Sequence, residues 1–213
     1  MTGNTTDLSK YVYLSDGGHF ENLGLYEMVR RRCRLIVVSD GGCDPDFEFA
    51  DLGNAVRKIS LDLGVPIYFR GLGNLKTRGA DDGDPCCGEK EESERLAALA
   101  SLPFHALGVI DYPKADDGGK PGLILYVKAG YHRDRIYNAG VRNYASANPD
   151  FPHQSTADQF FSESQFESYR ALGFEITDDL LNRTIIRLSN PAKPKLDDLI
   201  KLWRSDFDRT GVP

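Results

Sequence analysis

The chain has 213 residues, with 26 basic and 32 acidic side chains, a formal net charge of −6 and 40% hydrophobic residues. This composition excludes a disordered chain and a collagen-like repeat, and the length allows one large domain with enough apolar material for a core. The negative charge argues against nucleic acid as a partner, because phosphate binding needs a basic face. No apolar run approaches the roughly 20 residues needed to cross a bilayer, so we expect a soluble chain.

The first elements predicted along the chain form a βαβ unit. Residues 11–15 are rich in β-branched and aromatic side chains and end in a tight turn, which predicts a strand. Apolar residues at helical spacing predict a helix over 22–32, and the unbroken apolar run 35–39 predicts a strand buried on both faces. A strand, a helix and a strand in about 30 residues indicate parallel pairing.

The later elements continue the alternation of helices and strands. A surface loop, polar and rich in glycine, is predicted over 71–92. An antiparallel hairpin is predicted at the far edge of the sheet, with strands over 105–112 and 123–127. The other predictions are a helix over 50–59, a strand over 66–69, a helix over 164–172 capped by Ser162 and ended by Gly173, and an amphipathic helix over 196–207. The fold class predicted is α/β, with a mostly parallel sheet, flanking helices and a C-terminal hairpin and helices.

The tetrapeptide Ser-Asp-Gly-Gly occurs twice, at 15–18 and at 39–42, each time at the carboxyl end of a predicted strand. Parallel α/β sheets place their reactive groups at this edge. A carboxylate there can deprotonate a hydroxyl, and the glycines allow a substrate to approach the backbone closely. The spacing alone favours a simpler interpretation, in which each aspartate only closes a strand-to-loop turn.

Three stretches change this balance for the first copy: SDGGHFENLGLYE at 15–27, the arginine-rich end of the following helix, and STADQFF at 155–161 with QFESYRALG at 165–173. Together they resemble the bacterial patatin-like phospholipases, a family related in fold to cytosolic phospholipase A2. The resemblance implies a three-layer α/β/α domain and a Ser-Asp catalytic dyad. Asp16 would be the dyad aspartate, Gly17 and Gly18 its turn and Asn22 the signature asparagine, while Asp40 would be structural.

The sequence departs from that family at the nucleophile. None of its serines lies in the G-x-S-x-G elbow that exposes the nucleophile, and no glycine-rich oxyanion loop precedes the Asp-Gly-Gly turn. We therefore expect residues 1–213 to be the C-terminal portion of a patatin-like catalytic domain that supplies the dyad aspartate and is inert on its own. The resemblance implies a lipid or other acyl ester as substrate and no cofactor or metal. We expect a cytoplasmic protein with contact to the membrane surface in its full-length form, since the four cysteines show no disulfide or zinc pattern.

Several alternatives stay open at this point. The chain could be a non-catalytic interaction module derived from a patatin, and an exposed sheet edge near 11–15 could form a homodimer. His19 follows the first turn, where we favour a turn residue over a catalytic one. An acidic cluster could hold Mg²⁺ for phosphoryl transfer, although a solvated loop is the favoured interpretation; it comprises Asp40, Asp44, Asp46 and Asp51.

Two further groups of residues have a lipid-related interpretation. The basic cluster could meet anionic headgroups, although complementing the dipole of the helix end explains it as well; it comprises Arg30, Arg31, Arg32 and Arg34. Phe160, Phe161 and Phe166 could line an acyl-chain channel, but we favour a place for them in the core.

Overall fold

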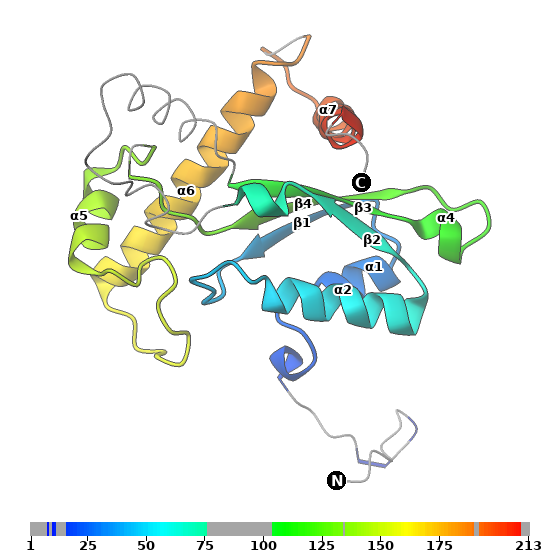
Figure 1. The fold of residues 1–213 in the computed structure, drawn as a ribbon, viewed down its shortest axis with the longest axis horizontal. Helices are drawn as coiled ribbons and strands as arrows, with labels where there is room; N and C mark the ends of the chain where they lie inside the picture. The colour runs from blue at the N-terminus through cyan, green and yellow to red at the C-terminus, as the bar shows by residue number, and fades with distance from the viewer. Residues whose placement is uncertain are drawn as a thin grey trace.

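The computed structural model describes Leu8, Lys10, Tyr11 and residues 16–75, 104–133, 135–189 and 192–209. In this part the chain is an α/β fold with one four-stranded sheet (Figure 1). The helices α1 (Leu25–Arg30) and α2 (Ala50–Leu63) cover one face of the sheet, and α6 (Glu163–Ile185) and α7 (Leu196–Arg209) lie on the other. The described helices include none long and apolar enough to cross a membrane.

The sheet has one parallel and two antiparallel pairings among the described strands. Its order is β1-β4-β3-β2; β1 pairs with β4 in parallel, and β3 pairs with both β4 and β2 in antiparallel fashion. The strands are β1 (Leu35–Asp40), β2 (Ile67–Arg70), β3 (His105–Ile110) and β4 (Gly122–Lys128). The predicted hairpin is confirmed as β3 and β4, joined through the short helix α4 (Tyr112–Ala115).

Two expectations about the sheet need correction. The described sheet is not mostly parallel, because a short connection joins β3 to β4 and forces them to run in opposite directions. The hairpin also lies at the centre of the sheet instead of its far edge, since β4 pairs with β1 on its other side. The strand predicted over 11–15, which would add a parallel pairing, lies outside the described residues except for Tyr11.

β1, an edge strand of the described sheet, is buried on one face but not fully on the other, which corrects its expected burial on both faces. Ile36 and Val38 point into the core formed with α1 and α2. Val37 points to the opposite face and is 60% exposed. The sequence pattern predicts two-sided burial because every residue of 35–38 is apolar, but no described element covers Val37.

The helices predicted over 50–59 and 196–207 are confirmed as α2 and α7. The helix predicted over 22–32 is confirmed in part, since α1 spans only Leu25–Arg30. Ser162 caps α6 as expected, because its side chain accepts a hydrogen bond from the backbone N–H of Gln165 at 3.1 Å. The expected end at Gly173 is wrong, since α6 continues to Ile185. Ile176 and Leu180 are buried beyond the glycine, and this packing outweighs a helix cost of about 1 kcal/mol for glycine.

A separate group of elements extends the fold beyond one end of the sheet. There α5 (Ala139–Ala147) packs against α6 around the fully buried Phe151. Of the loop predicted over 71–92, the structure describes residues 71–75, which contain the 3-10 turn Leu72–Asn74. The rest of that loop lies outside the described residues.

Candidate functional site

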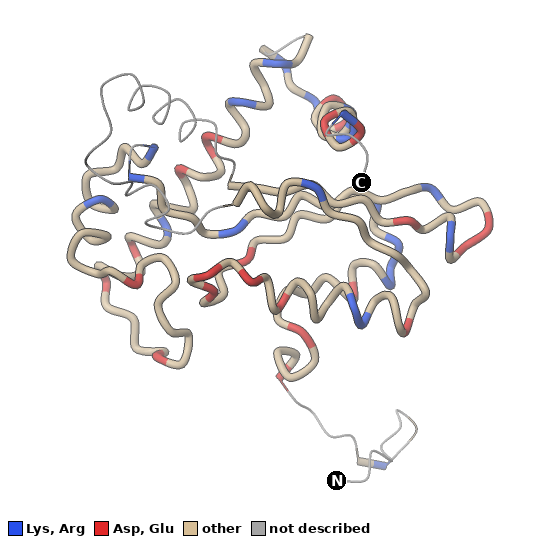
Figure 2. Tube along the Cα trace, in the orientation of Figure 1, with Lys and Arg blue, Asp and Glu red and all other residues tan. Residues whose placement is uncertain are grey.

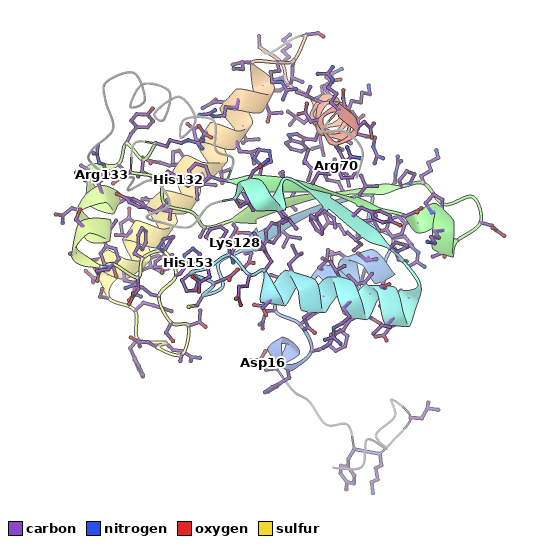
Figure 3. All side chains as sticks on the ribbon, viewed as in Figure 1. Asp16, Arg70, Lys128, His132, Arg133 and His153 are labelled. Atoms are coloured by element: carbon purple, nitrogen blue, oxygen red, sulfur yellow. The ribbon has the colours of Figure 1, made fainter. Side chains whose placement is uncertain are left out.

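The first Asp-Gly-Gly turn lies on the surface, next to the start of α2. Asp16 caps the 3-10 turn Gly17–His19, and its Oδ1 accepts a hydrogen bond from the N–H of Gly18 at 3.0 Å. Asp16 is exposed, and Figure 3 places it on the turn that leads to α1, outside the sheet. The carboxylate is therefore fixed by a local bond while it remains accessible from outside. His19 is an exposed residue of the same turn.

The turn is held against α2 by contacts to Phe20. The backbone carbonyl of Phe20 accepts hydrogen bonds from the side chains of Lys58 and Asn54. The Phe20 ring packs edge-on against Tyr26 with 4.8 Å between the centroids, and the Lys58 ammonium lies over it. Asn54 and Lys58 lie 34 and 38 positions after Phe20 in the chain, so the position of the Asp16 turn depends on a distant helix.

Gly18 and Asn22 are packed directly against each other. A Cβ atom on Gly18 would lie 2.7 Å from Asn22 Oδ1 and 3.5 Å from Asp16 Oδ1, whereas a Cβ on Gly17 would meet nothing within 4 Å. The Asn22 amide in turn donates from Nδ2 to Asp51 Oδ1 at 3.0 Å. The structure therefore brings together Asp16, Gly18 and Asn22 as the motif predicts, and it adds Asp51 from the first turn of α2.

The second Asp-Gly-Gly turn has a different environment. Asp40 ends β1 and is 5% exposed. Its Oδ1 accepts from the N–H of Gly42 at 2.8 Å, and its Oδ2 accepts from the Tyr126 hydroxyl at 2.5 Å and from Lys128 Nζ at 3.1 Å. Burial, together with the bond to Asp40, raises the pKa of Tyr126 and keeps its hydroxyl a donor. Asp40 is thus part of the internal structure, as the sequence predicts.

Lys128 binds a second carboxylate as well. Its Nζ lies 3.3 Å from Asp44 Oδ2, and its side chain is 2% exposed. Burial tends to raise the pKa of Asp44, but the N–H groups of Glu48 and Phe49 and the Lys128 ammonium lower it, and the pKa lies below its usual value. One buried cation therefore serves two carboxylates where β1 and β4 end.

Three of the four residues of the acidic cluster are bonded within the chain, while Asp46 is exposed, so the expected solvated loop is corrected for the buried Asp40. Acidic residues gather along the loop between β1 and α2 (Figure 2). Asp40 and Asp44 both face Lys128, and Asp51 is bonded to Asn22. Within the described ranges, no group of three or more His, Cys, Asp and Glu side chains could hold a metal ion.

His153 packs beside this network although it comes from the distant loop before α6 (Figure 3). Its Nδ1 accepts from the N–H of Asp44 at 3.3 Å, its carbonyl accepts from Cys43 Sγ at 2.9 Å, and its ring meets Phe47 edge-on. Burial is the main cause that lowers the pKa of His153, and the Lys128 ammonium lowers it further. The neutral ring is the form that can accept at Nδ1.

No sequence pattern indicated that Lys128, Tyr126 and His153 belong to this site. Lysine is almost never fully buried without a charged partner. A lysine at the end of an apolar strand is therefore a signal for a buried ion pair, but a weak one. Nothing in the local sequence of His153 indicates its contacts, since its partners are 109 and 110 positions away.

Two cavities meet at the carboxyl end of β1. The first, which we call the polar cavity, has a volume of about 360 Å³ and is lined by Asn22, Leu23, Ser39, Asp40, Gly41, Gly42, Cys43, Asp51 and Thr156. The second, the aromatic cavity, has about 170 Å³ and is lined by Gly41, Gln154, Ser155, Thr156, Phe161, Gln165, Phe166 and Tyr169. Gly41 and Thr156 line both, so the two cavities are adjacent.

The three phenylalanines expected in the core lie on the surface, and that interpretation is corrected. Phe160, Phe161 and Phe166 are 95%, 53% and 64% exposed. They line an open hollow of about 680 Å³ at the start of α6. Phe161 and Phe166 also line the aromatic cavity, which connects the hollow to the polar cavity.

Most of the basic cluster at the end of α1 is paired with carboxylates. Arg30 and Arg31 both bind Glu27, whose pKa their hydrogen bonds lower to about 2. Arg32 binds Asp116. These arginines are therefore engaged within the chain, and Arg34 remains an exposed member of the cluster.

Comparison of the chain with protein-family models, with curated proteins and with solved structures gave no match. The fold and the site define an α/β protein with a fixed, exposed carboxylate on one turn and a buried ion-paired network on the other. The two turns are connected through Asn22, Asp51 and the polar cavity.

Proposed function

We propose that the chain is part of a patatin-like lipid acyl hydrolase, a serine esterase of the phospholipase A type, in which Asp16 is the acidic member of a Ser-Asp dyad. One observation carries the proposal: the Asp16 carboxylate is exposed, fixed by the N–H of Gly18, and placed beside Asn22, which lines the polar cavity. Asn22 is bonded to Asp51, which also lines that cavity, so the Asp16 turn lies beside the polar cavity.

In this proposal the serine and its oxyanion hole come from outside the 213 residues. The serine attacks the ester carbonyl, Asp16 accepts the hydroxyl proton, and the same carboxyl then donates a proton to the leaving alcohol. The segment with the serine adds parallel strands beside β1, the edge strand of the described sheet, and completes a three-layer α/β/α domain. None of the serines in the chain lies in a G-x-S-x-G elbow, so the chain alone is expected to be inert towards esters.

The two aspartates have different roles in this scheme. Asp40 is saturated by Tyr126, Lys128 and the N–H of Gly42, so it cannot take up a proton from a substrate without breaking a buried ion pair. Its role is to hold the Gly41-Gly42 turn that lines the polar cavity.

The test uses the complete gene product that contains these residues, assayed on p-nitrophenyl butyrate. Asp16→Asn is expected to lower kcat/KM by about 10²- to 10⁴-fold, the usual contribution of a general base. Asp117→Asn is the matched control, because Asp117 is an exposed carboxylate on the turn between β3 and β4 and should leave activity unchanged. Serine-dependent turnover by the 213 residues alone, or full activity of Asp16→Asn, would overturn the proposal.

A further inference from the structure

Three exposed phenylalanines form one surface with the aromatic cavity. Phe160, Phe161 and Phe166 line the open hollow, and two of them continue into the aromatic cavity. Contiguous exposed apolar surface beside a cavity is typical of a ligand groove. The aromatic cavity shares Gly41 and Thr156 with the polar cavity, so the hollow and the two cavities lie next to one another from Phe160 to Asn22. We call these three spaces together the passage.

The volume of the aromatic cavity restricts its occupant. The aromatic cavity has a volume of about 170 Å³, comparable to the roughly 150 Å³ of an apolar cavity that binds one benzene molecule. A helix, with a diameter of about 10–12 Å including its side chains, is too wide to enter. A single hydrocarbon chain is thin enough, and it can continue along the phenylalanines of the open hollow.

The charges along the passage restrict the occupant further. In the described part of the chain, all charged side chains that line the two cavities and the hollow are acidic: Asp40, Asp51, Glu163 and Glu167. Arg170, which lies close to the hollow, is bound to Glu167. Asp40 is likewise paired with the buried Lys128, so this lining offers an anionic head group no attraction, whereas an uncharged ester can accept hydrogen bonds in the polar cavity.

We propose that this passage binds the acyl chain of an uncharged ester lipid, with the chain against Phe161 and Phe166 and the ester end in the polar cavity. The choice of an ester rests on the proposed function. Binding itself does not need the serine, so the 213-residue chain is sufficient for the test, and the result does not depend on turnover.

The first experiment measures displacement of the neutral dye Nile red by glycerol monoesters, each below the concentration at which it aggregates. Saturable binding of one ligand per chain is expected, and each added methylene from the C8 to the C10 ester should strengthen binding by up to about fourfold. Laurate, the anion, should bind more weakly than glycerol monolaurate. Absence of saturable binding by folded chain, or equal affinity for anion and ester, would overturn the proposal.

Phe166→Ser and Phe174→Ser give a matched pair on one helix. Both phenylalanines belong to α6 and are 64% exposed, but only Phe166 lines the passage. Phe166→Ser should weaken binding of glycerol monolaurate at least tenfold, and Phe174→Ser should leave it unchanged. Equal loss in both variants would indicate adsorption to any exposed ring and would refute the groove.

Two controls keep the result independent of folding and of catalysis. Each variant is compared with the parent chain by its thermal unfolding midpoint, and Phe161→Ser repeats the test at a second position of the passage. Asp117→Asn, which changes an exposed carboxylate that does not line the passage, should bind the ester as the parent chain does. If the 213-residue chain binds the ester but the complete Asp16→Asn gene product keeps its activity, only the proposed dyad is refuted. If Asp16→Asn abolishes activity but the 213-residue chain does not bind the ester, only the proposed groove is refuted.

Discussion

Lys128 Nζ lies 3.1 Å from Asp40 Oδ2, and both side chains are buried where β1 and β4 end side by side. The register pairs Asp40 directly with Lys128 across the parallel strands. The same ammonium reaches Asp44 in the following loop. This contact fixes the loop that lines the polar cavity, so its energetics decide how rigid that side of the candidate site is.

Lys128→Met should destabilise the fold by about 3–5 kcal/mol, because it leaves the buried Asp40 and the partly buried Asp44 without their cation. Urea unfolding of the purified variant measures the change. Lys201→Met is the control, since the Lys201 side chain is 79% exposed and lies 3.9 Å from Asp198, and exposed pairs of this kind contribute about 0–1 kcal/mol. Similar losses for both variants would show that the Asp40–Lys128 pair does not stabilise the fold.

Gly18→Ala and Gly17→Ala should differ although the glycines are neighbours. A Cβ on Gly18 would overlap Asn22 Oδ1, so the Asn22 amide must move away from Asp51, while a Cβ on Gly17 meets open space. Losing that hydrogen bond should cost about 0.5–1.5 kcal/mol, and Gly17→Ala should stay within about 0.5 kcal/mol of the parent. Chemical denaturation measures both values, and equal effects would contradict the packing of Gly18 against Asn22.

His153 should make stability depend on pH in the mildly acidic range. Its pKa is lowered from 6.5 by burial and by Lys128, with Asp40 and Asp44 also facing it. Between the pKa of His153 in the folded chain and 6.5, the unfolded chain binds more protons than the folded chain. The contribution of His153 to the free energy of unfolding is therefore complete above pH 6.5 and decreases as the pH falls through this window.

His153→Asn tests this dependence, because its side-chain oxygen can still accept from the N–H of Asp44. The slope of unfolding free energy against pH below 6.5 should become smaller in the variant. His105, whose pKa burial also lowers, should account for part of the remaining slope, and the double variant should reduce the slope further. An unchanged slope in His153→Asn would exclude the buried imidazole as its source.

Sequence patterns predicted the helices and strands well where the signal is local. The cap at Ser162 needs only the residues of one turn, and the hairpin of β3 and β4 needs only two apolar runs with turn residues between them. Gly173 failed as a helix end because the buried residues after it decide the outcome. The central position of β4 was not predictable from local signals, since its pairing with β1 joins segments far apart in the chain.

The candidate site divides in the same way. The neighbourhood of Asp16, Gly18 and Asn22 follows from a motif that spans seven positions in the sequence. The partners that hold this motif and its second copy come from other elements, namely Asp51 of α2 and Lys128 of β4. Their roles depend on how the sheet and helices pack, which the spacing of residues along the chain does not encode.

Self-association through the edge of β1 is the last prediction. β1 is six residues long, and among the described strands nothing pairs with its outer edge. Its residues 35–38 carry no charge and no proline, although natural edge strands use both to prevent pairing with another chain. Val37 adds an exposed apolar side chain at the middle of this edge.

Sedimentation of the 213-residue chain should therefore show a dimer whose fraction rises with protein concentration. Val37→Lys should shift the chain to monomer, because a lysine on an edge strand opposes pairing. Leu61→Lys is the control, since Leu61 is 74% exposed on α2 and lies away from the edge. If the parent chain is monomeric at every concentration, or if both variants dissociate the dimer equally, then β1 is not the surface of contact.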